Sequence, residues 1–114
     1  MVKFIKKRDE SVVEFQSEKI IKALVKALIA SKEDGQKANL IGEKIVSIAN
    51  VVYKKSIPSV ENIQDLVEQT LINEGYLATA KAYILYREQH AQLRKTKDIL
   101  ADALNLVDNY LGES

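Results

Sequence analysis

Basic side chains near the start of the chain are the residues best suited to bind an anion. Lys6, Lys7 and Arg8 follow one another at the end of a short β-prone segment. Arginine offers a planar fork of donors to phosphate oxygens, and lysine offers a compact point charge. The three residues could therefore form a phosphate clamp. Their simpler interpretation is a solvated hairpin tip, and the sequence leaves both open.

Lys19 gives a stronger indication of anion binding. It falls in the first turn of the first predicted helix, where unpaired backbone N–H groups and the helix dipole already favour an anion. A cation at this place is mildly unfavourable unless an anion is bound beside it. The position of Lys19 therefore favours a phosphate-binding role over a purely structural one.

The residues that most catalytic centres need are missing or scattered. The chain has no cysteine and a single histidine, His90, which lies in a polar helical run and is predicted to be exposed. Acidic residues do not cluster on any one predicted face, and four dispersed glycines cannot form a phosphate-binding loop of the Walker or dinucleotide type. The sequence therefore predicts no catalytic residue and no metal-ligating set.

Size and composition indicate one globular domain. The chain has 114 residues, of which 46% are hydrophobic and 29% charged. A formal net charge of +1 gives no reason to expect a nucleic-acid partner. The apolar stretches are too short to span a membrane, and the charged N-terminus does not resemble a secretory signal. We therefore expect a cytoplasmic protein that binds neither nucleic acid nor membrane.

The first part of the chain is predicted to form a hairpin and a helix. Residues 1–7 and 11–15 are β-prone and flank a polar turn, which is typical of a small hairpin. Ser17 is the predicted N-cap of the first helix, and residues 32–36, with Gly35, are predicted to end it. The apolar stripe of this helix comprises Ile20, Ile21, Leu24, Val25, Leu28 and Ile29.

Three more helices are predicted to follow. The second has the apolar stripe Leu40, Ile41, Ile45, Ile48, Ala49 and Val52, and the third has Val60, Ile63, Val67 and Leu71. Ser59 is the predicted N-cap of the third helix and Gly75 its terminating residue, and a fourth helix runs from near Tyr76 to Gly112. The predicted fold is mainly α, a four-helix cluster capped by the hairpin, with a C-terminal helical extension.

Two blocks far apart in the chain carry a family resemblance. The first comprises FIKKRD (residues 4–9), VVEF (12–15) and SEKII (17–21), and the second VENIQDLVE (60–68) and AKAYILYR (80–87). Together, in this order and separation, they resemble the ATP-cone, the nucleotide-sensing domain at the N-terminus of many ribonucleotide reductases. The resemblance runs from about Val2 to Arg94 and predicts an ATP-cone domain over residues 1–95.

The resemblance implies that ATP and dATP bind as effectors, accompanied by Mg²⁺. It places the triphosphate near Lys7, Arg8 and Lys19. It also implies that Arg87 either lies near the effector phosphates or forms a charge pair that holds the fourth helix. The alternative for Arg87 is the polar end of an amphipathic stripe.

The resemblance further implies that the nucleotide base lies between the hairpin and the first helix. Ile5, Phe15 and Ile20 match positions that line this region, and Gln64 matches a position near the base. Ile5, Phe15 and Ile20 could instead be plain core residues, and Gln64 could face solvent. The family usually has glycine after the aspartate of the turn, whereas this chain has Glu10, which leaves the turn conformation open.

Residues 96–114 carry further apolar side chains at helical spacing: Ile99, Leu100, Ala103, Leu106, Val107 and Tyr110. They are predicted to form either an extra helix packed on the domain or a linker helix toward a missing catalytic domain. The run VDNYL (residues 107–111) resembles the stretch ahead of the catalytic barrel in anaerobic (class III) ribonucleoside-triphosphate reductases.

These resemblances predict an allosteric domain with no chemistry of its own, in a parent reductase that ATP keeps active and dATP shuts down. Its partners would be an adenine nucleotide and the parent catalytic domain, with self-association through the cone or the tail. The alternative is a helical protein-interaction or nucleic-acid-binding module without nucleotide sensing.

Overall fold

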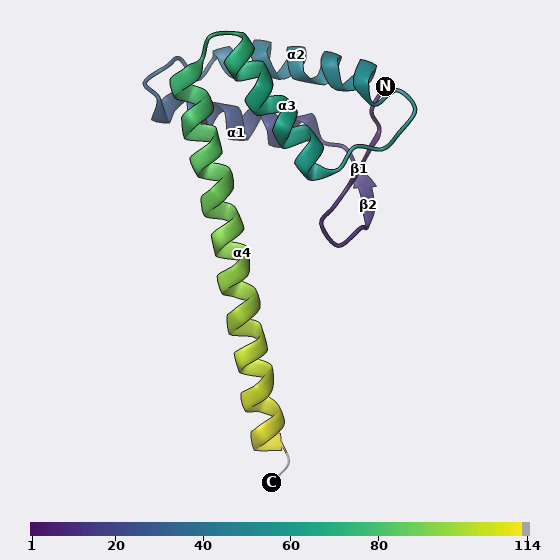
Figure 1. Cartoon of the computed structure of the whole chain (residues 1–114), viewed down its shortest axis with the longest axis vertical. Coiled ribbons are helices and arrows are strands. Elements are labelled where there is room, and N and C mark those ends of the chain that lie inside the picture. The colour runs from purple at the N-terminus through teal and green to yellow at the C-terminus, as the bar shows by residue number, and fades with distance from the viewer. Residues whose placement is uncertain (113–114) are drawn as a thin grey trace. The chain divides into compact units, whose positions relative to one another are not determined.

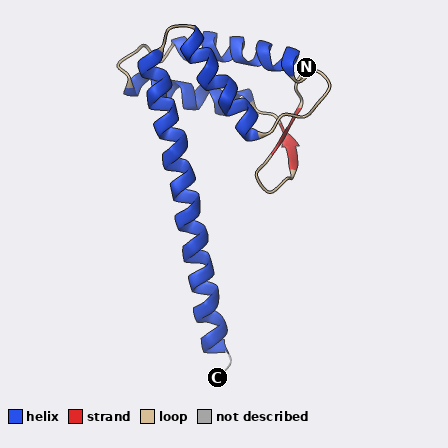
Figure 2. Ribbon diagram, in the orientation of Figure 1, coloured by secondary structure: helices blue, strands red, loops and turns tan. Residues whose placement is uncertain are grey.

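A computed structural model describes residues 1–112, with side chains described through Asn105. Over these residues the elements are β1 (Phe4–Lys6), β2 (Val12–Glu14), α1 (Ser17–Ala30), α2 (Lys37–Val52), α3 (Val60–Asn73) and α4 (Leu77–Gly112) (Figure 1). Figure 2 shows that helix dominates, with strand confined to the N-terminal hairpin. The predicted mainly helical fold with a small hairpin is therefore confirmed.

The described residues form two units, Met1–Ile84 and the residues from Leu85 onward. The first unit contains the hairpin, α1 to α3 and the start of α4, and the second consists of the rest of α4. No helix within the described residues is long and apolar enough to cross a membrane.

The hairpin is short and depends on the helices for support. Its two strands are antiparallel, with Ile5 opposite Val13, and an isolated pair of this size is marginal in water. The backbone N–H of Lys6 donates to the Pro58 carbonyl at 2.9 Å, and Lys6 pairs in parallel with Ser59. The other edge of β1 is therefore tied to the segment that leads into α3, and Figure 1 shows the hairpin beside that end of α3.

The turn between the strands has a left-handed residue. Glu10 adopts a φ of 70°, a region that glycine enters at no steric cost and other residues avoid. Its N–H donates to the Lys7 carbonyl at 2.9 Å, while one carboxylate oxygen of Asp9 accepts from both the N–H and the hydroxyl of Ser11 at 3.0 and 2.6 Å. The hydrogen bonds from Ser11 hold the pKa of Asp9 below its ordinary value of 3.8. The turn is thus closed by Asp9 and strained at Glu10.

Replacing Glu10 by glycine is expected to stabilise the chain by up to about 1 kcal/mol, because glycine removes the steric cost of the left-handed backbone. The contact between Lys6 and Glu10 that is lost is 4.0 Å long and exposed, so it contributes little. Glu10→Gln is the matched control, since it removes the same charge but keeps the β-carbon. Urea unfolding should place Glu10→Gly above both wild type and Glu10→Gln, and equal stability of the two variants would contradict the strain.

The core of the first unit is made by α1, α2, α3 and the start of α4. Its buried apolar side chains are Ile20, Leu24, Ala27, Leu28, Ala38, Ile41, Ile45, Ala49, Ile63, Val67, Leu71, Ala80 and Tyr83. The predicted stripes are confirmed at most positions. They are wrong at Ile29, Leu40 and Val52, which are 62%, 73% and 56% exposed. Ile29 and Leu40 lie on the face of their helices opposite the buried residues, and Val52 is the last residue of α2.

Both predicted ends of α3 are confirmed. Ser59 Oγ accepts from the Asn62 N–H at 3.0 Å, and Asn62 Oδ1 accepts from the Ser59 N–H at 2.9 Å, which makes a reciprocal capping box. Gly75 has a φ of 85°. The N–H groups of Gly75 and Tyr76 return to the Ile72 and Leu71 carbonyls, the Schellman arrangement.

The start of α1 differs from the prediction, whereas its end agrees with it. Ser17 is the first helical residue, and Gln16 is the N-cap without a side-chain hydrogen bond, so the Ser17 cap is wrong. At the other end, residues 32–36 end the helix as predicted, and the left-handed residue among them is Lys32, with a φ of 63°. The N–H groups of Lys32 and Glu33 return to the Ile29 and Leu28 carbonyls at 3.0 and 2.8 Å, which again is a Schellman closure.

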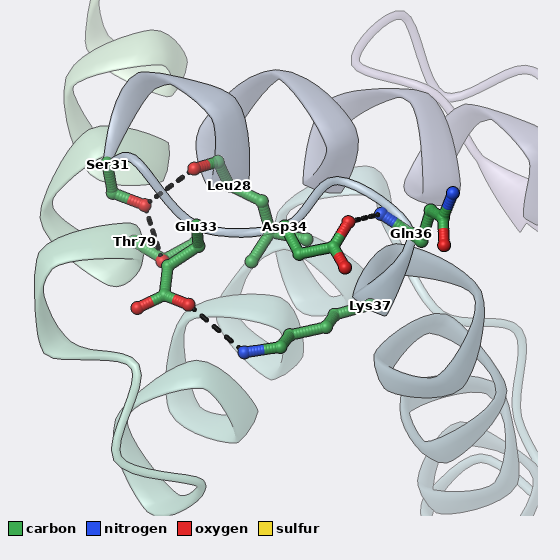
Figure 3. A network of polar contacts seen from close by, with 7 residues as sticks. All are labelled: Leu28, Ser31, Glu33, Asp34, Gln36, Lys37 and Thr79. Atoms are coloured by element: carbon green, nitrogen blue, oxygen red, sulfur yellow. Dashed lines mark hydrogen bonds and ion pairs between the residues drawn. The ribbon is translucent and has the colours of Figure 1, made fainter.

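A polar network joins the end of α1 to its neighbours (Figure 3). The Ser31 hydroxyl lies 3.0 Å from the Leu28 carbonyl oxygen and 2.7 Å from the hydroxyl of Thr79, which is 1% exposed. Lys37 at the start of α2 pairs with Glu33 at 3.1 Å, and this hydrogen bond raises the pKa of Lys37. The hydroxyl pair fixes the first turn of α4 against α1, a contact that the sequence pattern did not predict.

Candidate functional site

The tip of the hairpin meets the first turns of α3. Arg8 Nε lies 2.9 Å from Glu61 Oε1, and Arg8 Nη2 lies 3.5 Å from Gln64 Oε1. The pairing of β1 with Pro58 and Ser59 brings the tip to this place, and the capping box at Ser59 fixes where α3 begins. Residues from the two distant sequence blocks therefore form one surface.

Lys19 lies at the start of α1, as predicted. It is the third residue of the helix, and no side chain caps this helix end. Its side chain is exposed, and within the described part of the chain its ammonium takes part in no ion pair. The helix dipole and the ammonium group together favour an anion at this end of α1, where Glu18 adds one negative charge to the same turn.

The predicted base-lining residues differ in how accessible they are. Ile20 is 8% exposed and belongs to the core, so its side chain is mainly structural. Ile5 and Phe15 are half-buried and pack against the core from the hairpin side. Gln64 is half-buried rather than facing solvent, and its amide oxygen is the atom that Arg8 contacts.

Arg87 belongs to the second unit, so the structure does not place it beside the hairpin or α1. It is half-buried and has an interaction of its own. Its role toward the effector phosphates stays a prediction. His90, in the same unit, is exposed as predicted, and its ring lies 4.2 Å from that of Tyr86.

Charges of both signs surround the hairpin tip. Lys6, Lys7 and Arg8 are exposed, and Asp9, Glu10 and Glu61 provide the carboxylates. Asp9 is engaged by Ser11, while Glu61 is engaged by Arg8. Glu61 belongs to the second block of the family pattern, but no local pattern could reveal that it faces Arg8.

A metal ion would have no preformed site here. Among the described residues, no group of three His, Cys, Asp or Glu side chains could hold a metal ion. Magnesium commonly binds through one or two carboxylates together with the phosphates of a ligand. The residues at the tip therefore fit Mg²⁺ only as a companion of a phosphate ligand.

Comparison with known families and proteins gives a consistent result. The family model described as "ATP cone domain" matches residues 3–92. The chain is 37% identical over 117 residues to the vitamin B12-dependent ribonucleoside-diphosphate reductase of Thermoplasma acidophilum, which covers 96% of this chain and 15% of that protein. It is also 37% identical over 102 residues to the ribonucleoside-diphosphate reductase subunit alpha of Chlamydia trachomatis, which covers 81% of this chain and 10% of that protein.

A third similar protein is the vitamin B12-dependent ribonucleoside-diphosphate reductase of Mycobacterium tuberculosis. The identity is 31% over 96 residues, which covers 84% of this chain and 13% of that protein. The chain thus spans 10–15% of the length of these three relatives. Their names do not include an anaerobic triphosphate reductase, so that part of the predicted resemblance is not confirmed.

Proposed function

The chain belongs to the ATP-cone family, and on this premise we propose that it binds ATP and dATP as allosteric effectors of a ribonucleotide reductase. One observation carries the proposal. Arg8, from the first block of the family pattern, contacts Gln64 and Glu61, from the second. This contact joins the two blocks at the hairpin tip, and the start of α1, which no side chain caps, follows the hairpin in the chain.

In this proposal three cations bind the triphosphate. Arg8 presents its planar fork, Lys7 adds a point charge, and Lys19 binds together with the N-terminal amides of α1. Mg²⁺ arrives with the nucleotide and is held mainly by its phosphates. Arg87 is the predicted fourth cation, supplied from α4.

The base occupies the region between the hairpin and α1. Ile5 and Phe15 supply half-exposed apolar surface for the base, and both pack against the core cluster to which Ile20 belongs. Gln64 has both donor and acceptor atoms and can read a polar edge of the base. Binding of the base would therefore draw on residues from β1, α1 and α3.

Regulation requires that ATP and dATP favour different states of the parent protein. Two ligands can drive opposite states only through different affinities for those states. The named relatives are reductases of the vitamin B12-dependent type and of the alpha-subunit type, which supports a reductase catalytic domain as the partner of this chain. An anaerobic parent remains a prediction from residues 107–111, whose side chains lie outside the described residues.

Calorimetric titration with ATP, dATP, GTP and a short DNA duplex tests the function. We expect binding of the adenine nucleotides in the micromolar range and no heat from DNA. DNA binding without nucleotide binding would instead support the alternative, a helical nucleic-acid-binding module.

The tail allows a separate prediction. Ile99, Leu100 and Leu104 are 68%, 57% and 63% exposed, and the side chains of Leu106, Val107 and Tyr110 lie outside the described residues. We expect truncation after Lys95 to leave ATP affinity within about threefold, because every proposed binding residue precedes it, and to abolish a weak self-association caused by exposed apolar surface. Calorimetry and light scattering with and without dATP check both parts. A strict monomer in every condition would contradict self-association and leave nucleotide binding intact.

A further inference from the structure

We propose that Glu61 competes with phosphate for Arg8, so that it sets the affinity of the site and makes ligand binding release the hairpin tip from α3. The inference rests on the proposed function in one respect only, namely that the phosphate belongs to a nucleotide.

The contact between Arg8 and Glu61 is direct. Arg8 Nε donates to Glu61 Oε1 at 2.9 Å, and Nη2 lies 3.5 Å from Gln64 Oε1. Two of the three guanidinium nitrogens thus contact side chains in the first turns of α3. The two charged side chains remain 37% and 48% exposed, so water and dissolved anions can reach the pair.

The three proposed phosphate-binding cations are not equivalent in the ligand-free chain. Lys7 and Lys19 are exposed and form no ion pair with a carboxylate within the described residues, whereas Arg8 does. Glu61 offsets the charge of Arg8 and occupies its Nε–H, while Gln64 lies beside Nη2. A phosphate that binds the Nε and Nη2 edge of the guanidinium through two hydrogen bonds must therefore displace the carboxylate.

The exchange is energetically accessible because ion pairs at exposed sites are weak. A triphosphate carries several charges and bonds to arginine more strongly than a single exposed carboxylate does. Once displaced, the Glu61 carboxylate stays near the phosphates and repels them, which lowers affinity further. Pairing with Arg8 and repulsion of the phosphates therefore act in the same direction, and Glu61 weakens the binding of phosphate.

The exchange also has a structural consequence. The Arg8 contacts are side-chain links between the hairpin tip and α3, additional to the backbone pairing of Lys6 with Pro58 and Ser59. Transfer of Arg8 to a phosphate removes these contacts to Glu61 and Gln64 together. On phosphate binding, the hairpin tip would thus exchange its side-chain contacts with α3 for contacts with the ligand.

Titration of Glu61→Gln with ATP and, separately, with inorganic tripolyphosphate tests the inference. Glutamine keeps the size of the side chain but lacks the charge that pairs with Arg8. We expect both ligands to bind about threefold to tenfold more tightly to this variant, from loss of the ion pair and of the repulsion.

Glu43→Gln is the matched control, because Glu43 is exposed on α2 and forms no ion pair among the described residues. It should change either affinity by less than about 1.5-fold, the small effect of a distant screened charge.

A double-mutant cycle with Arg8→Gln separates competition for Arg8 from general repulsion. If Glu61 acts mainly by holding Arg8, Glu61→Gln should tighten binding by less than about twofold in the Arg8→Gln background, since no fork remains to be released. The same tightening in both backgrounds would overturn the exchange. Unchanged or weaker binding of both ligands to Glu61→Gln itself would overturn it as well.

The two ligands distinguish this inference from the proposed function. If the wild-type chain and Glu61→Gln bind ATP with equal affinity, the proposed nucleotide function is still supported, but the exchange of Arg8 between Glu61 and phosphate is contradicted. If the wild-type chain binds ATP no more tightly than tripolyphosphate, the adenosine contributes nothing and the nucleotide function is contradicted. The exchange is still supported in that case if Glu61→Gln binds tripolyphosphate more tightly than the wild type does. If neither ATP nor tripolyphosphate binds to the wild-type chain or to Glu61→Gln, both the exchange and the nucleotide function are contradicted.

Discussion

Lys19→Ala is expected to weaken ATP binding by about 1–3 kcal/mol, the loss typical of a charge-assisted contact to phosphate. Lys19 is exposed at the third position of α1 and forms no ion pair among the described residues, even with Glu18 in the same turn, so its charge remains available to a ligand. The melting temperature without ligand should barely change, because an exposed cation in a first turn does not stabilise its helix. Calorimetric titration measures the first quantity and thermal unfolding the second.

Lys22→Ala is the matched control for this variant. Lys22 is exposed on the same helix but lies past its first turn, where the backbone amides are already bonded within the helix. We expect it to lose less than about one third of the free energy that Lys19→Ala loses, because the helix-terminal effect decays within the first turn. Equal losses in the two variants would show only a general dependence on charge, and no loss in Lys19→Ala would remove Lys19 from the site.

Adenine nucleotide is expected to raise the melting temperature of the chain. A ligand that binds only the folded state stabilises it by about 2.7 kcal/mol at a hundredfold excess over its dissociation constant. For a domain of this size, that corresponds to a shift of roughly 10 °C or more. Differential scanning calorimetry at several ATP concentrations should show the shift growing with the logarithm of concentration.

AMP serves as the comparison ligand for the same experiment. If Lys7, Arg8 and Lys19 read the β- and γ-phosphates, AMP at equal concentration should produce a much smaller shift than ATP. Equal shifts would mean that these cations are solvated surface and that the base supplies the affinity.

Local chemistry explains which parts of the fold were predictable from the sequence. Ser59 and Gly75 were correctly predicted as the ends of α3, because a capping hydroxyl and a left-handed glycine act within a few residues of the chain. Lys32 was missed as the left-handed residue after α1. Leu28 is fully buried and fixes where the last turn of α1 lies, so the chain must reverse before it reaches Gly35.

The site was predictable only in part for a related reason. Lys7, Arg8 and Lys19 could be identified from residue type and from their position in a turn or a helix start. The pairing of Arg8 with Glu61 depends on β1 pairing with Pro58 and Ser59, a long-range contact that no local pattern indicates. Arg87 could be placed on α4 by periodicity, but periodicity does not bring it to the hairpin.

The central claim is that an adenine nucleotide binds to residues of the hairpin tip, the start of α1 and the first turns of α3. Titration of ¹⁵N-labelled chain with ATP, followed by amide chemical shifts, tests it most directly. We predict that the largest changes occur at Lys7, Arg8, Lys19 and Gln64, whereas the amide of Glu43 on α2 changes little. Largest changes on α2 or in the residues after Lys95, or no changes at saturating ATP, would contradict the claim.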